Sequence, residues 1–368
     1  MCKLTVKAKI ERGDYDFGTY ISEPGFLSAV KEVENSTERK VIGIKNLYFV
    51  GNDDKENILN AVPTDIDAGF ALAADESGLY DESDLIQCRP YAVKTLCDRL
   101  GISGSVLLKF ANTELVDILK KCTEKFEDDK VTIVKVGPRA AAVLSGNYKV
   151  IPADEVLVSA SKKLKKFGGS FKSGYITIDG LSADYIIDNP DISKAYSEFA
   201  NLKGAIPSVT VSTSNTGLGA AEIVPKFAFK NRDVIIGAPL KTLHKGSGDI
   251  DKVTENFEQI FALFQQSAKN LKKLKGVKID HPVECFKNVA KRVLLPKKYS
   301  LMAADDFEGF VDEDTTAYDI YFGLAEILFY AESDDKPKSY IGMLQEQIAR
   351  ALFLDYSRYD TPTADWNA

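Results

Sequence analysis

The sequence predicts an α+β protein with a mixed or antiparallel sheet, packed helices and a helical C-terminal part. Short runs of β-branched and aromatic residues, separated by polar turns, recur before residue 230 and predict strands. From residue 250 onward, apolar residues recur at spacings of three and four, which predicts helices. The chain has 368 residues, 45% hydrophobic and 27% charged, and these proportions exclude a disordered, collagen-like or membrane-embedded chain.

The N-terminal region is predicted to be rich in strands. Residues 1–10 alternate polar and apolar side chains, which predicts a strand and not an export signal. Residues 41–51 form a second apolar run, closed by a Gly-Asn-Asp turn. The expected regions are a strand-rich N-terminal part at 1–88, an α+β core at 89–248, a helical part at 249–355 and a loosely held tail at 356–368.

Two helices joined by a tight glycine-containing turn are predicted at residues 90–125. Such a pair is either a helix-turn-helix reader of DNA or an αα-hairpin packed on a sheet. The segment carries too few basic residues to grip phosphates, so we favour the hairpin. Further strands are predicted at residues 131–136, 140–144, 148–152, 175–178, 209–211 and 220–229, with a helix after Asp154.

Residues 250–275 form the clearest predicted helix, because an apolar stripe runs along it from Phe257 to Leu274. The stripe is either a dimerisation seam or a face packed within the chain, and we favour packing within the chain. Gly276 ends this helix. Two more helices are predicted at residues 316–330 and 339–354.

The cysteines and histidines argue against disulfides and metal sites. The five cysteines are widely spaced and include no Cys-x-x-Cys pair, so we expect a reducing cytoplasm and no zinc knuckle. The two histidines, His244 and His281, lack metal-ligand spacing. We therefore expect no metal and no cofactor.

Lysines gather in three clusters although the net charge is −7. They lie at residues 156–178, 268–278 and 287–298, whereas residues 303–335 hold eleven acids and no base. If the basic clusters share one face, they form a phosphate-binding surface. The alternative is that each cluster is the solvated face of an amphipathic helix.

Aromatic residues interleave with the first lysine cluster. Ammonium groups that follow phosphates, beside rings that stack on bases, are what single-stranded nucleic acid requires. The alternative places these rings in the protein core. The candidate nucleic-acid-binding residues are Lys162, Lys163, Lys165, Lys166, Lys172, Phe167, Phe171, Tyr175, Lys269, Lys272 and Lys273.

The polar turn at residues 214–219 is the richest local motif. It lacks the third glycine of a dinucleotide fingerprint and the Gly-Lys-Ser/Thr of a P-loop. We expect instead an anion turn whose backbone N–H groups face an anion. Its candidate residues are Ser214, Asn215, Gly217 and Gly219.

Signatures of catalysis are weak. Gly-x-Ser-x-Gly is absent, so there is no nucleophile elbow. His244 precedes Gly246-Ser247-Gly248, which we interpret as a flexible turn in preference to a His/Ser pair. The acids of residues 303–335 lack the order of a calcium loop. We expect no catalytic site.

Five segments occur in an order that carries a family resemblance. They are Arg99-Leu100-Gly101-Ile102; Arg139-Ala140 with Leu144-Ser145, Tyr148-Lys149 and Asp154-Glu155-Val156-Leu157; Ser214-Asn215-Thr216-Gly217 with Ile223 and Pro225; His244-Lys245-Gly246; and residues 316–330. Over residues 90–355 the chain resembles the phage/plasmid-like protein family catalogued as domain of unknown function 932. It departs from the family pattern at Asn231-Arg232-Asp233-Val234, where the family has Cys-x-Asn-Gly, and at Tyr318, where it has Trp.

The resemblance implies a gene of a phage, plasmid or integrated element, and no established activity. Because genes of relatives often lie near replication and recombination genes, the resemblance favours a role in DNA metabolism. We therefore expect a non-enzymatic accessory protein that associates with nucleic acid and binds single strands.

The alternative function is a protein–protein module, either a structural or assembly component of a phage or an inhibitor of a host defence complex. In that case the acids of residues 303–335 mimic nucleic acid or dock on a basic partner, and the 250–275 helix supports a homo-oligomer. A metal-dependent nuclease comes third and would need converging carboxylates. We expect a cytoplasmic protein, in the host cell if phage-encoded, with a virion location left open and no membrane contact.

Overall fold

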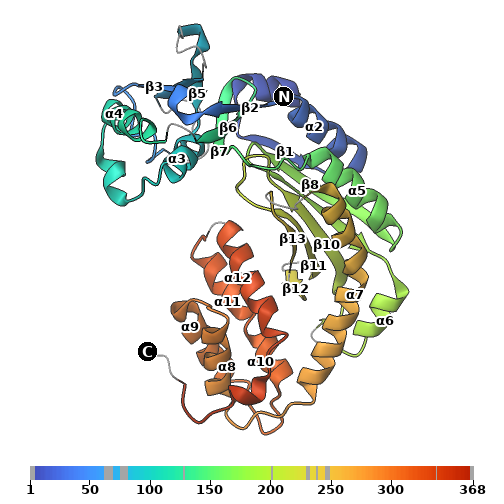
Figure 1. Ribbon diagram of the computed structural model, residues 1–368. Coiled ribbons are helices and arrows are strands. Elements are labelled where there is room, and N and C mark those ends of the chain that lie inside the picture. Colours follow the sequence, from blue (N-terminus) through green and yellow to red (C-terminus); the bar gives the residue numbers. More distant parts are fainter. Residues whose placement is uncertain are drawn as a thin grey trace.

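The computed structural model contains two β-sheets, a layer of helices against one of them, and a helical C-terminal part (Figure 1). This confirms the α+β class predicted from the sequence. The structure describes residues 5–61, 69–74, 82–126, 129–199, 202–228, 233–237, 239–244, 249–336 and 338–364.

The first sheet, sheet A, is antiparallel, in the order β1-β8-β9-β10-β11-β12, with β13 paired to β11. Its inward side chains alternate along each strand, as in β9, where Leu181, Ala183 and Tyr185 are buried. Its strands are β1 (Asp16–Tyr20), β8 (Gly169–Thr177), β9 (Leu181–Ile187), β10 (Ile206–Thr213), β11 (Ala221–Ala228), β12 (Asp233–Ile235) and β13 (Leu240–Thr242).

The second sheet, sheet B, is mixed, in the order β2-β6-β7-β5-β4-β3, because β5 and β7 run parallel. It curls, so that Lys40 Nζ on β2 donates to the carbonyl of Ala74 at the end of β4, at 2.6 Å. Its strands are β2 (Thr37–Gly43), β3 (Leu47–Gly51), β4 (Phe70–Ala74), β5 (Ile86–Cys88), β6 (Lys130–Val136) and β7 (Arg139–Ser145).

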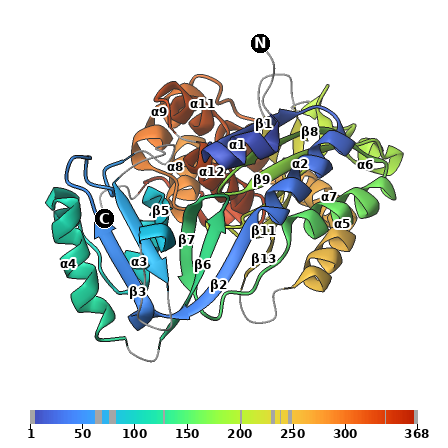
Figure 2. The same ribbon diagram turned by 90° about the horizontal axis from the view of Figure 1, so that it is seen from above.

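Helices α2 (Glu23–Asn35), α5 (Ala153–Lys165) and α7 (Ile250–Lys275) cover one face of sheet A, and α6 (Pro190–Tyr196) packs on α7 (Figure 1). Helix α3 (Pro90–Arg99) packs on β7 and α4 (Asn112–Thr123) on β3 (Figure 2). Both helices of residues 90–125 thus pack on sheet B, but residues 100–111 join them through a 3₁₀ helix at Ser105–Lys109 and not through the expected tight turn. The C-terminal part contains α8 (Pro282–Arg292), α9 (Lys297–Glu308), α10 (Ala317–Gly323), α11 (Glu326–Ser333) and α12 (Lys338–Ala351).

The apolar stripe of α7 is buried within the chain. Phe257, Phe264 and Leu271 have no exposed surface, and Tyr196 of α6 donates its hydroxyl to the Phe264 carbonyl at 2.6 Å. The stripe therefore packs against the same molecule, as favoured from the sequence. Gly276 caps the helix, as predicted.

Three sequence predictions are wrong in detail. Val6–Arg12 forms helix α1, not a strand, because Thr5 caps its N-terminus and Gly13 adopts the left-handed conformation at its C-terminus. Residues 41–51 are divided between β2 and β3 by a 3₁₀ turn at Ile44–Asn46. Residues 148–152 form no strand.

The predicted helix at residues 316–330 is two helices, α10 and α11, which separate just after Gly323. The Phe307 ring lies so close to this glycine that a Cβ there would come within 2.9 Å of it. Sheet pairing also crosses the expected boundary at residue 88, because β1 belongs to sheet A while β2–β5 pair into sheet B. The N-terminal region is therefore not a separate strand-rich unit.

Candidate functional site

The first lysine cluster spans α5 and β8, and two of its lysines are neutralised by carboxylates. Lys163 Nζ lies 2.5 Å from Glu258 Oε1 on α7, and Lys165 Nζ lies 2.8 Å from Glu23 Oε2 on α2. Lys162 and Lys166 are exposed, and Lys172 is exposed at the β-bulge of β8. The five lysines therefore do not present one continuous basic face.

The aromatic residues of this cluster do not gather beside its lysines. Phe171 packs between Phe26 and Tyr185, with ring centroids 5.4 and 5.8 Å away, so it belongs to the core under α2. Phe167 stacks on Phe261 of α7 at 6.2 Å. Both rings are thus engaged within the protein and are not free to stack on a base, which corrects the expectation for these two residues.

Tyr175, the third ring, is 37% exposed but lies on the other side of sheet A. It alternates along β8 with the buried Ile176, which faces α5, and its hydroxyl is hydrogen-bonded to Asp16. The rings and lysines that alternate along the sequence therefore do not lie side by side in the folded protein.

The second cluster lies on the last turns of α7, away from the first. Lys163 of the first cluster contacts Glu258 on α7. Lys269 lies eleven residues after Glu258 on the same helix, which is about 16 Å along its axis. Lys272 lies 3.6 Å from Glu198, while Lys269 and Lys273 are exposed. Lysines in these last turns also suit the negative end of the helix dipole.

Two N–H groups of the turn after β10 are engaged within the turn itself. Ser214, Asn215 and Thr216 are buried, and the N–H groups of Thr216 and Leu218 donate to Ser214 Oγ at 3.2 and 3.1 Å. Ser214 Oγ in turn donates to the Asp179 carbonyl at 2.6 Å. The Ser214 side chain is therefore used to hold the turn together, while the anion role expected of Ser214, Asn215, Gly217 and Gly219 stays a prediction.

The same turn borders a buried polar cluster between the two sheets, which we call the polar junction. Arg89, just before α3, is 1% exposed and donates from Nη2 to the carbonyls of Gly13 and Asp14. Its guanidinium lies 5.8 Å from the centre of the Tyr15 ring. Asp179, in the turn between β8 and β9, accepts hydrogen bonds from Tyr15 and Thr216.

Burial dominates the electrostatics of the polar junction. It lowers the pKa of Arg89 to about 10, although the Asp179 carboxylate acts in the opposite direction. Burial likewise raises the pKa of Asp179, against the effect of its hydrogen bonds and of Arg89. Each charge therefore offsets part of the penalty that burial imposes on the other. Within the described part of the chain, Arg89 Nε and Nη1 have no hydrogen-bond partner.

A second part of the polar junction joins residues that carry the family resemblance. Tyr148 stacks on His244 with ring centroids 5.0 Å apart, and its hydroxyl donates to the Ser214 carbonyl at 3.4 Å. Gly217 has a φ of 74°, and a Cβ there would meet Leu144 at 2.8 Å. Residues distant in sequence thus meet at one place. Lys245 to Gly248, the rest of the expected histidine motif and turn, and residues 231 and 232 lie outside the described residues.

The polar junction lacks the geometry of a catalytic centre. His244 Nδ1 bonds the Lys149 carbonyl at 3.2 Å, and its Nε2 has no partner among the described residues, so no nucleophile is paired with this base. The parts of the chain that the structure describes hold no group of three or more His, Cys, Asp or Glu residues arranged for a metal ion.

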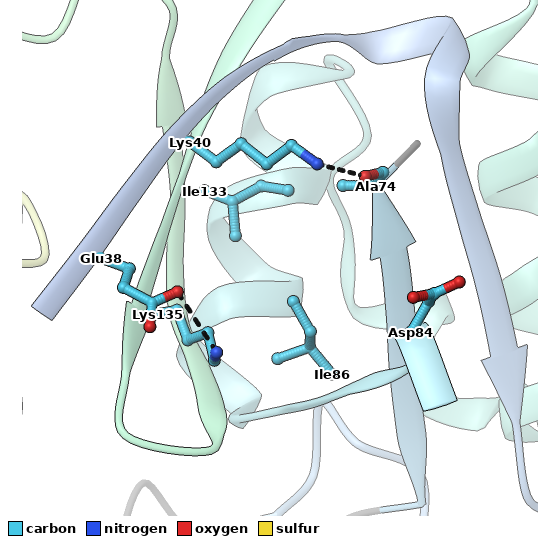
Figure 3. A pocket seen from close by; sticks show the side chains of 7 residues that line it. All are labelled: Glu38, Lys40, Ala74, Asp84, Ile86, Ile133 and Lys135. Atoms are coloured by element: carbon cyan, nitrogen blue, oxygen red, sulfur yellow. Dashed lines mark hydrogen bonds and ion pairs between the residues drawn. The ribbon is translucent and has the colours of Figure 1, made fainter. Parts of the chain in front are cut away.

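A recess of about 330 Å³ lies on one face of sheet B, over β2, β6, β5 and the end of β4 (Figure 3). Ile86 and Ile133 form its apolar surface, and Glu38, Lys40, Asp84 and Lys135 surround it. Lys135 pairs with Glu38 at 3.3 Å, and Lys40 donates to a carbonyl. These charges satisfy one another, so the recess offers little to a charged ligand.

A larger hollow, of about 840 Å³, lies among α9, α10 and α11; we call it the acidic hollow. Phe307, Phe322 and Gly323 contribute to its apolar surface, and Phe310 beside it is 83% exposed. Its carboxylates come from Asp306, Asp312, Asp314, Asp319 and Glu326.

The carboxylates of the acidic hollow bond neutral donors. Asp306 accepts from the Tyr330 hydroxyl, Asp312 from the Asp314 N–H at 2.9 Å, and Asp319 from the Thr316 hydroxyl at 2.7 Å. Within the described residues, no lysine or arginine forms an ion pair with Asp306, Asp312 or Asp319. The carboxylates of Asp306, Asp312 and Asp319 therefore lack a cationic partner among the described residues.

Sequence reasoning identified the acids of this hollow but missed its shape and the polar junction. The signal for the hollow was the eleven acids without a base, to which Phe307, Phe310 and Phe322 add an aromatic spacing. Arg89 carries no local signal, because a single arginine before a proline is common.

Comparisons with known proteins identify no relative of this chain. No family model, no curated protein and no solved structure matches the chain. In the described residues, no helix combines the length and the apolar character needed to span a membrane.

Proposed function

We propose that this chain is a protein–protein interaction module that binds a basic partner protein at the acidic hollow. The observation that carries the proposal is a partly apolar hollow in which the carboxylates of Asp306, Asp312 and Asp319 form no ion pair with a lysine or arginine among the described residues. An assembly component or an inhibitor of another complex both fit such a module. The module needs no catalytic group of its own.

Electrostatics and exposure support this choice of partner. Clustered carboxylates repel one another, and a cationic partner relieves that repulsion while speeding its own association. Phe310, at 83% exposure, is a large apolar side chain that costs free energy while it faces water. An interface that pairs the acids and covers this ring gains from both effects.

The test is binding of a defined cationic probe, a fluorescein-labelled peptide of leucine and lysine, followed by fluorescence anisotropy at low and high salt. Neutralising Asp306, Asp312 and Asp314 together to asparagine is expected to weaken binding about tenfold at low salt and less at high salt. The control changes Asp54, Asp117 and Glu124 to their amides, which alters net charge equally. Equal effects of the two triple variants would mean that net charge, and not the hollow, attracts the peptide.

Association with single-stranded nucleic acid is the second candidate function. It is favoured by Lys162, Lys166 and Lys269, which are exposed and have no carboxylate partner among the described residues. Salt-sensitive binding of labelled single-stranded DNA, lost when these three lysines are changed to glutamate, would support it. No binding at low salt would remove this function.

The biological setting is a further part of the proposal. The ordered motifs from Arg99 to Tyr330 support a place in the phage/plasmid-like protein family, and so in a phage, plasmid or integrated element. The absence of a disulfide pattern among the cysteines supports a cytoplasmic location.

A further inference from the structure

The elements that line the acidic hollow indicate which secondary structure a bound partner segment adopts. Its lining residues lie on α9, α10 and α11 and on the connection between α9 and α10 (Figure 1). No strand contributes to the lining, so there is no sheet edge on which an extended peptide can add a strand. Two common modes remain, a polyproline segment docked between aromatic rings and a helix that lays its apolar face into a groove. Of the two, an amphipathic helix is the one that displays cations beside a continuous apolar stripe.

The apolar part of the hollow is built before any partner arrives. Phe307 packs on Phe286 with ring centroids 5.3 Å apart, and Phe322 packs on Tyr318 at 4.8 Å. Gly323 lets the Phe307 ring pack directly against α10, because a Cβ there would come within 2.9 Å of that ring. Rings that are fixed by such contacts form a preformed apolar surface, which lowers the entropy cost of binding.

Charge and apolar surface together define the occupant. A purely hydrophilic basic segment would pair with the carboxylates but leave Phe310 and Phe322 in contact with water. A purely apolar segment would bury Asp312 and Asp314 without a counter-charge, which is costly. Only a segment with both characters satisfies the whole surface.

We propose that the acidic hollow binds a basic amphipathic helix, with an apolar side chain seated against Phe307, Phe310 and Phe322 and with lysines or arginines beside it. The inference rests on the proposed function, and it adds that the partner is helical and apolar on one face. The apolar contact supplies affinity, and the cations supply attraction and orientation.

The experiment compares two peptides of identical leucine and lysine composition with the full-length protein. One has leucines at helical spacing, and the other has them scrambled so that no apolar face forms. We expect the amphipathic peptide to bind at least tenfold more tightly and to gain helicity on binding, measured by circular dichroism. Phe310→Ala is expected to weaken binding of the amphipathic peptide about tenfold, and that of the scrambled peptide little.

Because Phe310 is highly exposed, its replacement is not expected to unfold the protein, and an unchanged melting temperature checks this. Phe329→Ala is the matched control, since Phe329 is 62% exposed on α11 and does not line the hollow. Equal affinity of both peptides, or no effect of Phe310→Ala, would overturn the helix inference while the charge variants could still uphold the proposed function. If neither peptide binds, the proposed function itself fails.

Discussion

Replacing Arg89 with methionine tests whether the polar junction stabilises the fold. Methionine keeps an unbranched side chain of similar length, so much of the packing on Tyr15 is retained. The substitution removes the hydrogen bonds to the carbonyls of Gly13 and Asp14, and it leaves the Asp179 carboxylate buried without its cation.

The magnitude follows from this loss. Removing one of two buried opposite charges is costly because the other stays behind in a poorly solvating site, and for a direct ion pair the cost is about 3–5 kcal/mol. Arg89 and Asp179 attract each other without a direct ion pair, so the lower end of this range applies. Arg89 and Asp179 are 1% and 6% exposed, so solvent screens them little. We expect Arg89→Met to lower the free energy of unfolding by about 3 kcal/mol, since methionine restores part of the apolar contact.

Asp179→Asn completes a double-mutant cycle. The amide oxygen still accepts hydrogen bonds from Tyr15 and Thr216, so the expected cost is smaller, about 2 kcal/mol. With both charges gone, no uncompensated charge is left. The double variant should therefore be more stable than the sum of the two single effects predicts, by at least about 1 kcal/mol.

The assay is urea unfolding at pH 7, followed by far-ultraviolet circular dichroism. Arg12→Met is the control, because Arg12 pairs with Asp14 at the surface with 57% of its side chain exposed, and its loss should cost under about 0.5 kcal/mol. Strictly additive effects in the cycle, or an Arg89→Met variant as stable as the wild type, would refute the coupling of the two buried charges.

Three further predictions concern stability. Burial lowers the pKa of His244, so the unfolded chain takes up its proton first as the pH falls below about 6.5; stability should drop there in urea titrations, and less so in His244→Gln. A Cβ at Gly174 would overlap the buried Phe26 ring, so Gly174→Ala should cost about 2 kcal/mol or more in unfolding free energy, with Phe26→Leu restoring part of it. Lys241 joins β13 to Glu346 on α12 at 2.9 Å, and Lys241→Met should cost about 1 kcal/mol in low salt and less in 1 M salt, where an unchanged cost would contradict an ionic contribution.

Hydrophobic periodicity in the sequence predicts an element correctly where one face of that element is buried. The apolar stripe of α7 follows from periodicity, because burial of a single face imposes the 3.6-residue repeat. Strands β6 and β7 are instead predicted by continuous apolar runs, because both of their faces are buried. Helix α1 was mistaken for a strand because its seven residues show alternation over too short a length, whereas its caps at Thr5 and Gly13 decide the structure.

Helices α8 and α9 were missed although their signals are present. Pro282 begins α8, and Cys285, Phe286 and Val289 then line its buried face at helical spacing. The lysines in this stretch are assigned to the third basic cluster in the sequence, and no separate helix is predicted there.

The candidate site depended on contacts that no local pattern contains. Lys163 meets a glutamate 95 residues away and Lys165 one 142 residues away, so partners on other helices neutralise two of the five lysines of the first cluster. Arg89 and Asp179 come from separate sheets, and their burial exists only when the sheets meet.

The sequence by itself determined the α+β class, the helical C-terminal part and the separation of acids from bases, because these depend on composition and on short repeats. The tertiary structure alone decided which charges remain uncompensated. It pairs lysines of the first cluster with carboxylates and leaves acids of residues 303–335 beside exposed aromatic surface. The physical reason is that electrostatic pairing depends on distance in space, which a sequence does not specify.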